Sequence, residues 1–236
     1  ASEGGSWRKK IFEHYKISRS RGKEDSSMDW NLLFETVNEI RDSLKEFFPW
    51  KVIQVRGAEA DDIIAVLAKK NKSEEVEEDF FMSSSDSKKK TLIISGDKDF
   101  QQLQKFGNVE QFSPTLKKWV KCSDPERFLK EHILRGDSGD SVPNMLSPDR
   151  TFVDSIRQSP IQKEIEEAFC ARSFEDFKKD LESGKILPRL KSRISLDELE
   201  RNYWRNKTLI DFEEIPGQIQ TEILDKYNEK QTGDLN

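Results

Sequence analysis

The chain has 236 residues, enough for one large domain or two small ones. Charged residues make up 36% of it and the net charge is −5, which argues against a purely basic nucleic-acid-binding module. No run of about 18 apolar residues occurs, so we expect no transmembrane helix and no membrane partner. Cys122 and Cys170 lack metal-type spacing, and we expect free thiols in a reducing, cytoplasmic compartment.

The first predicted element is a basic helical segment that begins at Trp7. Between residues 8 and 23 its only acid is Glu13. Its cations are Arg8, Lys9, Lys10, Lys16, Arg19, Arg21 and Lys23. A solvated helix face and a phosphate-binding surface are equally good interpretations of such a segment. Asp29 is then predicted to cap a second helix, whose apolar residues recur at helical spacing until Pro49.

An α/β pattern follows as far as about residue 121. After the first predicted strand, the motif Glu59-Ala-Asp-Asp62 opens a helix, and after the second, Asp97-Lys-Asp99 opens a short one. A polar, mobile loop is predicted between them, over 71–90. The predicted strands are 51–55, 91–95, 109–112 and 118–121. This alternation indicates a parallel sheet with covering helices.

The rest of the chain is predicted to be mostly helical. Asp124-Pro125 is typical of an N-cap followed by a first-turn proline, and Ser195-Leu-Asp-Glu198 of a capping box. The candidate helices are 125–134, 151–158, 160–171, 173–182, 195–206 and 216–229. We therefore expect two domains, an α/β domain over 1–121 and a helical domain over 122–236.

Two acidic motifs are predicted to meet at one edge of the sheet. Asp97 and Asp99 lie just beyond the carboxyl end of a strand, where open α/β sheets bind ligands. The strand over 51–55 would deliver Glu59, Asp61 and Asp62 to the same edge. A single acid there would be an ordinary first-turn residue of a helix. Two such clusters favour a divalent-metal site, in which two ions about 4 Å apart can clamp the oxygens of a phosphodiester.

A third acidic pair, Asp137 and Asp140, lies in Gly136-Asp-Ser-Gly-Asp140. The glycines permit a tight turn, and such a turn before another helix can present backbone N–H groups to a DNA phosphate. Asp140 could also reach the metal site, and an ordinary polar loop is the alternative. His14 and His132 have no partner histidine nearby, so we predict surface or half-buried rings rather than metal ligands.

Several motifs together resemble the flap endonuclease or 5′-nuclease family, most closely its bacteriophage members. The likeness extends from Trp7 to about Tyr227. It implies a resolvase-like (PIN-like) α/β nuclease core, followed by a helical part with a helix-hairpin-type DNA-binding element over about 126–144. The motifs are Trp7-Arg-Lys, Glu59-Ala-Asp-Asp62, Ile94-Ser-Gly-Asp-Lys-Asp-Phe100, Phe112-Ser-Pro114, Lys117-Lys-Trp-Val120, Gly136-Asp-x-x-Asp140 and Leu209-Ile-Asp-Phe-x-x-Ile-Pro216.

The resemblance also implies roles for individual residues. Two Mg²⁺ ions, for which Mn²⁺ can substitute, would be held by Glu59, Asp61, Asp62, Asp97, Asp99 and Asp140. Catalysis would depend on Asp62 and Asp97, together with Arg8 and Lys16 facing the scissile phosphate. Tyr15 would stack on a splayed base. Nucleic acid would further contact Lys9, the arch residues Arg19, Arg21 and Lys23 within about 8–27, and the turn residues Gly136, Asp137, Ser138 and Gly139.

The implied function is a Mg²⁺-dependent 5′-to-3′ nuclease that removes RNA primers and adjacent DNA during phage replication. Its substrates would be DNA and RNA–DNA hybrids with a 5′ flap or fork. A monomer is expected, with a phage single-stranded-DNA-binding protein and replication proteins as partners, in the host cytoplasm. The alternatives are a Toprim-like phosphotransfer enzyme and a catalytically incomplete DNA-binding fragment.

The sequence departs from the family pattern in two places. Family members carry two strands that each end in an aspartate before the region that Trp7 begins, and this chain starts after both. We therefore expect a nuclease core without its first strands, in a fragment that could be inactive alone. The glycine-rich end of the hairpin motif is replaced by Met145-Leu-Ser-Pro-Asp149, which puts a monovalent-cation site in doubt.

Overall fold

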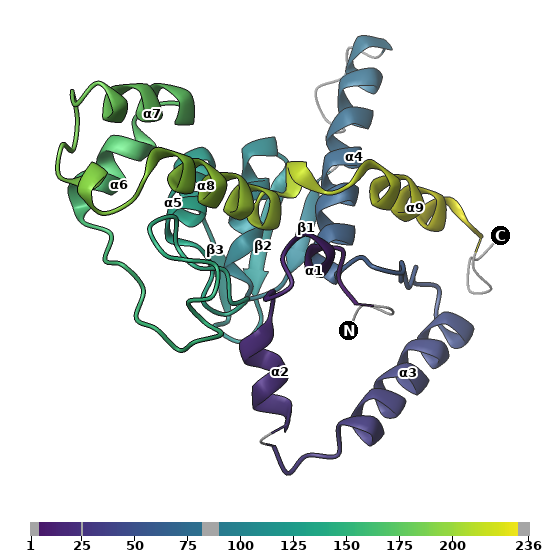
Figure 1. Ribbon diagram of the computed structural model, residues 1–236. Helices are drawn as coiled ribbons and strands as arrows, with labels where there is room; N and C mark the ends of the chain where they lie inside the picture. Colours follow the sequence, from purple (N-terminus) through teal and green to yellow (C-terminus); the bar gives the residue numbers. More distant parts are fainter. Residues whose placement is uncertain (1–4, 25, 82–89, 231–236) are drawn as a thin grey trace.

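A three-stranded mixed sheet lies at the centre of the molecule (Figure 1). The computed structural model describes residues 5–24, 26–81 and 90–230. Strand β1 (Thr91–Ile94) pairs in parallel with β2 (Val109–Ser113), which pairs in antiparallel fashion with β3 (Lys118–Val120). The hairpin at Ser113-Pro114 and the strand positions confirm the predictions for this stretch. A parallel pair requires a crossover connection, and the 3₁₀ helix η1 (Lys98–Phe106) provides it.

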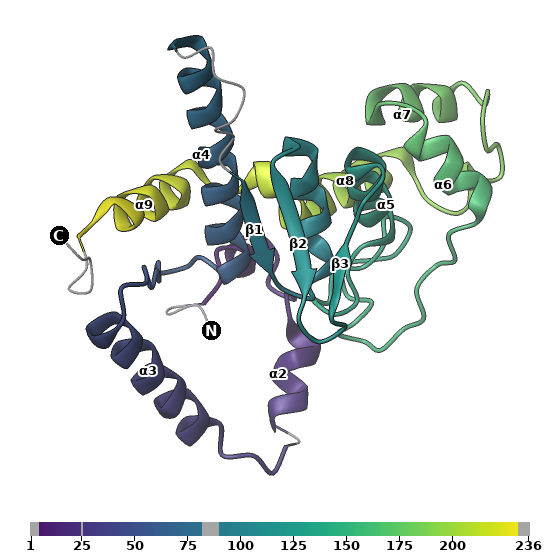
Figure 2. The ribbon, with the colours of Figure 1, turned by 180° about the vertical axis from the view of Figure 1, so that it is seen from behind.

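The part of the chain before the sheet is helical. Its helices are α1 (Arg8–Ile11), α2 (Ile17–Glu24), α3 (Trp30–Phe47) and α4 (Ala60–Phe81). Helix α4 packs against β1 and η1, whereas α2 and α3 project away from the body in both views (Figures 1 and 2). Asp29 caps α3 as predicted, by accepting the N–H groups of Asn31 and Leu32. No side chain of α3, all of which the structure describes, is buried.

The second half of the chain is helical, as predicted. Asp124 and Ser195 are N-caps, so both capping predictions are confirmed. A long C-terminal path then returns to the sheet, where α9 lies beside α4 (Figure 1). The elements are α5 (Pro125–Arg135), α6 (Lys163–Cys170), α7 (Phe174–Glu182), η2 (Leu190–Ser192), α8 (Leu196–Ile210), η3 (Phe212–Glu214) and α9 (Gly217–Asn228).

Two hydrophobic cores hold these elements together, and each draws on both halves of the sequence. Phe12 and Tyr15, from the N-terminal segment, are buried in the core of the helical part. Ile215 and Ile223, from the C-terminus, are buried with Trp7 in the core beside the sheet. The predicted domain boundary near residue 121 stays a prediction, because each core contains residues from before and from after this position.

Three predictions of secondary structure are wrong. Residues 51–55 form no strand, although Val55 is buried. Residues 71–81 continue α4 instead of forming a loop, because their four Glu residues and one Lys are good helix formers; residues 82–89 lie outside the described part. Residues 151–158 form no helix: 151–155 are turns, and Ser155 takes a left-handed φ of 54° that a helix cannot contain.

The predicted helix-hairpin element is only partly present. Helix α5 ends at Arg135, and the motif after it folds into a turn closed by a bridge between Asp137 and Val142. In residues 136–162, all of which the structure describes, no second helix is present. Both cysteines are free thiols, as predicted. Within the described ranges, no helix is long and apolar enough to span a membrane.

Candidate active site

Three segments bring the acidic motifs together near the carboxyl end of β1. Glu59, Asp61 and Asp62 lie at the start of α4, and Asp97 and Asp99 follow β1 at the start of η1. The third segment is the turn after α5, which carries Asp137 and Asp140. A cavity of about 20 Å³ lies between the segments, and this is room for one water molecule or one ion. Its polar lining is Arg8, Tyr15, Asp61, Asp99, Asp137 and Asp140.

One half of this cluster is neutralised by the protein's own cations. The Arg8 guanidinium lies between Asp62, with nitrogen–oxygen distances of 2.8 and 3.1 Å, and Glu59 at 3.2 Å. Asp62 is fully buried and also accepts the Trp7 indole N–H and the Glu59 backbone N–H. Burial lowers the pKa of Arg8, but the charge and hydrogen bond of Asp62 outweigh it and raise the pKa overall.

This arrangement changes the expected roles of Arg8 and Asp62. Arg8 is 3% exposed, and its Nε also donates to the Leu209 carbonyl at 2.8 Å. Both groups are therefore paired with each other inside the protein. In this conformation Arg8 does not face a substrate phosphate, and Asp62 offers no accessible oxygen to a metal. They instead hold Glu59 and the start of α4 in place.

Tyr15 and Lys16 link the first two segments to the third. The Tyr15 hydroxyl lies 2.9 Å from Glu59 Oε2 and 2.8 Å from Asp140 Oδ2. Lys16 pairs with Glu59 and lies 3.6 Å from Asp140. Burial raises the pKa of Glu59, but the hydrogen bond and charge of Lys16 hold it below its usual value overall. Tyr15 is 3% exposed, so the predicted stacking on a splayed base does not fit this conformation.

The charges of the other half of the cluster are compensated less fully. Burial, with the nearby charges of Asp97 and Glu59, raises the pKa of Asp61 to about 6. Burial, with the charges of Asp97 and Asp137, raises the pKa of Asp99 to about 6, although His132 opposes the shift. Asp97 itself is exposed and caps η1 through the Asp99 N–H. Oxygen ligands that repel one another in a cavity of atomic size fit a divalent cation.

The turn after α5 is rigidly built. Gly136 takes a φ of 66°, and a Cβ there would lie 2.4 Å from the Val142 carbonyl oxygen, so only glycine fits. Asp137 Oδ1 accepts the N–H groups of Gly139 and Asp140. Those N–H groups are therefore used inside the turn, and the prediction that they face a DNA phosphate is wrong for this conformation.

The predicted basic arch is largely held against the protein. Arg19 pairs with Asp140 at 2.6 Å and donates to the Gly139 carbonyl. Arg21 donates to two backbone carbonyls in the turns over 151–155. Lys23 lies over the rings of Trp30 and Phe34. Lys9 is exposed. Arg19 thus lies at the rim of the acidic cluster, whereas Arg21 and Lys23 contact other parts of the protein.

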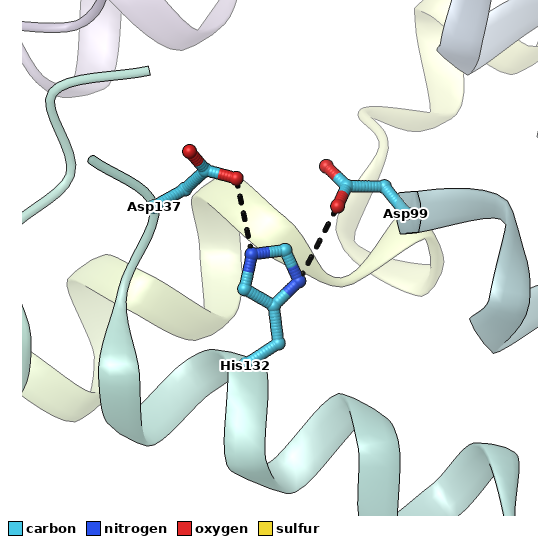
Figure 3. Close-up of side chains that lie close together, drawn as sticks. All are labelled: Asp99, His132 and Asp137. Atoms are coloured by element: carbon cyan, nitrogen blue, oxygen red, sulfur yellow. Dashed lines mark hydrogen bonds and ion pairs between the residues drawn. The ribbon is translucent and has the colours of Figure 1, made fainter. Parts of the chain in front are cut away.

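Sequence reasoning missed His132. It was expected to be a surface or half-buried ring, but it is 6% exposed and lies between Asp99 and Asp137 (Figure 3). These three residues form a group whose ligand atoms lie within 4.8 Å of one another. The available signal was its position in the last turn of a helix that ends directly before the Gly136 motif.

Comparisons with known proteins agree with this geometry. Residues 1–132 match the family described as 5′-3′ exonuclease, N-terminal resolvase-like domain. Ribonuclease H of Enterobacteria phage T4 is 36% identical over 233 residues, which cover 96% of this chain and 67% of that protein. A 5′-3′ exonuclease of Mycoplasmopsis pulmonis is 23% identical over 94% of this chain and 66% of its own length.

Solved structures show the same fold. A bacteriophage T5 flap endonuclease in complex with DNA and metal ions superposes with a TM-score of 0.66 at 18% identity, covering 97% of this chain and 82% of that one. A T5 5′-exonuclease with bound zinc gives a TM-score of 0.62, covering 96% and 80%. The matches confirm the resolvase-like nuclease fold and favour a nuclease over the Toprim-like alternative.

Proposed function

The chain belongs to the 5′-3′ exonuclease family of nucleases, and we propose that it acts as a Mg²⁺-dependent 5′-to-3′ nuclease on primers and flaps. The observation that carries the proposal is the less compensated half of the acidic cluster. Asp61 and Asp99 line one cavity at the end of β1, and burial and neighbouring carboxylates raise their pKa values despite the positive groups nearby. Such carboxylates are poised to exchange protons for a divalent cation.

The proposed role of each residue follows from its position in the cluster. Asp61, Asp97, Asp99 and Asp140 would hold Mg²⁺, which when bound polarises the phosphodiester and activates water for attack on it. Arg8 and Asp62 would hold the first turn of α4 in position. Lys16 and Arg19, at the rim, would offset the charge of an approaching phosphate once they leave their carboxylate partners.

We further propose the substrate and setting from the relatives. The T4 relative is a ribonuclease H, and a T5 neighbour is a flap endonuclease solved with DNA. This chain would accordingly cleave RNA–DNA hybrids and DNA with a 5′ flap or fork. It would work as a monomer in the host cytoplasm beside a single-stranded-DNA-binding protein and other replication proteins, with two Mg²⁺ ions that Mn²⁺ can replace.

A cleavage assay tests the proposal. The chain is incubated with a 5′-labelled flap duplex and an RNA–DNA hybrid, with Mg²⁺ or with EDTA, and binding is measured separately in Ca²⁺. We expect cleavage that requires Mg²⁺ and that Asp97→Asn abolishes while DNA binding is retained. Full cleavage by Asp97→Asn would refute the site. Salt-sensitive binding without any cleavage would support the catalytically incomplete DNA-binding alternative instead.

A further inference from the structure

One face of α8 holds the loop over residues 143–149, which has no role in the function proposed so far. Helix α8 packs against α5 (Figure 1), and the loop follows the turn at the end of α5. Asn202, Arg205 and Asn206 are spaced by three and four residues, so their side chains share one face of α8. All three are buried. Polar groups buried together in this way are expected to be fully hydrogen-bonded.

The Arg205 guanidinium lies at the centre of these contacts. Its Nη2 donates to the carbonyl oxygens of Pro143 at 2.8 Å and Asn144 at 3.3 Å. Its Nη1 pairs with Asp149 at the end of the loop, and its Nε donates to Asn206 Oδ1 at 2.9 Å. Burial lowers the pKa of Arg205, and the hydrogen bond and charge of Asp149 oppose this shift. Arginine keeps its charge in proteins, so a positive charge lies inside the fold against the loop.

The two asparagines complete the contacts with the loop. Asn206 Nδ2 donates to the Pro143 carbonyl at 2.9 Å. Asn202 Nδ2 donates to the carbonyls of Met145 at 3.0 Å and Ser147 at 3.3 Å. Side chains of α8 therefore supply donors to four carbonyl groups of the loop.

The family pattern implies a monovalent-cation site at the glycine-rich end of the hairpin motif, which is the 143–149 loop in this chain. Carbonyl oxygens that replace the water shell of the ion hold potassium in proteins. Here four such oxygens already accept N–H groups from α8, and the guanidinium charge among them would repel a second cation. The residues present therefore do not fit a monovalent cation.

We propose that the Arg205 guanidinium is the resident cation of the 143–149 loop and orders it for contact with duplex DNA, so that the loop requires no potassium. That the loop contacts DNA rests on the nuclease function proposed above. Arg205 is 9% exposed and does not reach a phosphate itself, so it is a positioning residue that acts through the loop backbone. The exposed end of the loop begins at Pro148, where the duplex would approach.

The first test uses the unmodified chain and needs no DNA. Amide hydrogen exchange is measured in potassium chloride and in choline chloride at equal ionic strength. The reporter is the Met145 N–H, which donates to the Leu134 carbonyl, and the control is the Ser95 N–H, which donates to Phe112 in the sheet. We expect each amide to exchange equally fast in the two salts. Slower exchange of Met145 in potassium alone would reveal a potassium site and overturn the proposal.

The second test asks whether the loop needs the charge of Arg205. In Arg205→Ala the Met145 amide should exchange about tenfold faster or more, because hydrogen bonds to a charged group are lost. Guanidinium and urea share a planar shape and differ in charge. Millimolar guanidinium should therefore slow the exchange again, whereas urea should not. Arg201→Gln, an exposed change on the same helix, is the control and should respond to neither.

Equal responses of Arg205→Ala to guanidinium and urea, or no response to either, would overturn the proposal. If Arg205→Ala does not fold, Arg205→Lys and Arg205→Gln are compared instead. Lysine keeps the charge and should retain the slower exchange of Met145, and equal exchange in these two variants would likewise refute a role for the charge.

DNA binding connects the loop with the proposed function. The affinity of the unmodified chain for the flap duplex in Ca²⁺ should be the same in potassium and choline salts. It should fall about tenfold in Arg205→Ala and recover with guanidinium. Potassium-dependent affinity of the unmodified chain, or unchanged affinity in Arg205→Ala, would overturn this inference and leave the nuclease standing. A chain that binds no DNA would remove the nuclease function, and the exchange experiments would still decide whether Arg205 is the resident cation.

Discussion

The two halves of the acidic cluster contain the same residue types, but they differ in how far the protein compensates their negative charges. Asp62 and Glu59 are surrounded by Arg8, Lys16 and a ring of hydrogen-bond donors. Asp61 and Asp99 are partly buried, and burial together with neighbouring carboxylates outweighs the positive groups near them. The negative charges of the first half are balanced by the protein's own cations and hydrogen-bond donors. Those of the second half are balanced only when protons or a cation are added.

The difference shows which acids maintain the structure and which can bind a ligand. A buried carboxylate with a bidentate guanidinium contributes to a fixed local geometry, and removing its partner leaves a buried charge. A buried carboxylate among like charges costs stability, and the fold retains it only with some compensating benefit. Asp61 and Asp62 are adjacent in the sequence and yet have different roles.

The largest effect is expected from breaking the compensated half. Arg8→Gln removes the cation between Asp62 and Glu59, and it should lower the free energy of unfolding by about 3–5 kcal/mol, since Asp62 is left buried and unpaired. Urea unfolding followed by circular dichroism measures this. Arg150→Gln is the control, because its ion pair with Asp154 is exposed, and it should leave the unfolding midpoint unchanged. Equal midpoints for both variants would mean that the Arg8 pair is not a structural element.

A smaller effect of opposite sign is expected in the less compensated half. Asp99→Asn removes a charge that burial and Asp97 disfavour, so without metal it should raise the free energy of unfolding by about 2 kcal/mol at pH 7.5. Mg²⁺ should stabilise the unmodified chain and have little effect on the variant. Thermal unfolding with and without Mg²⁺ gives both quantities.

Asp137→Asn is the matched comparison for Asp99→Asn. It lies on the other side of His132, but His132 and Lys98 stabilise its charge, so its loss should lower stability. Destabilisation by both variants would show that Asp99 is as well compensated as Asp137, and the distinction between the two halves would fail.

The sequence predicted the parts of the site that depend on local order. Asp97 and Asp99 directly follow a short apolar strand, and Asp124 and Ser195 cap helices, because these features depend on neighbours within a few residues. The motifs of the family also placed Glu59, Asp61 and Asp140 close together, as the structure does.

Long-range contacts could not be predicted in this way. Arg8 reaches Leu209 and Asp62, and Tyr15 reaches Asp140, across separations of more than 50 residues. Whether a cation faces solvent or a buried carboxylate is decided by these contacts, and no spacing in the sequence encodes them. The burial of His132 depends likewise on where η1 and the Gly136 turn meet.

The smallest predicted effect is the pH dependence of stability without metal. Asp61 and Asp99 have native pKa values of about 6, above the ordinary value of 3.8, so the native state binds more protons than the unfolded state between these values. Their contribution to stability is fully present below about pH 4 and is lost as the pH rises through 6. Glu59 and Asp137 act oppositely, but their pKa values are lowered, so their effect falls below about pH 4.5.

Between pH 5 and 7 the raised pair should therefore dominate. In EDTA the free energy of unfolding should be about 1 kcal/mol higher at pH 5 than at pH 7, as chemical denaturation across this range will measure. Saturating Mg²⁺ should flatten or invert the slope, because the ion replaces the protons and competes with them as the pH falls. An Asp61→Asn/Asp99→Asn double variant should show neither the slope nor the response to Mg²⁺. Stability in EDTA that instead rises from pH 5 to 7 would mean that the charges of Asp61 and Asp99 are compensated within the fold, as those of Asp62 and Glu59 are.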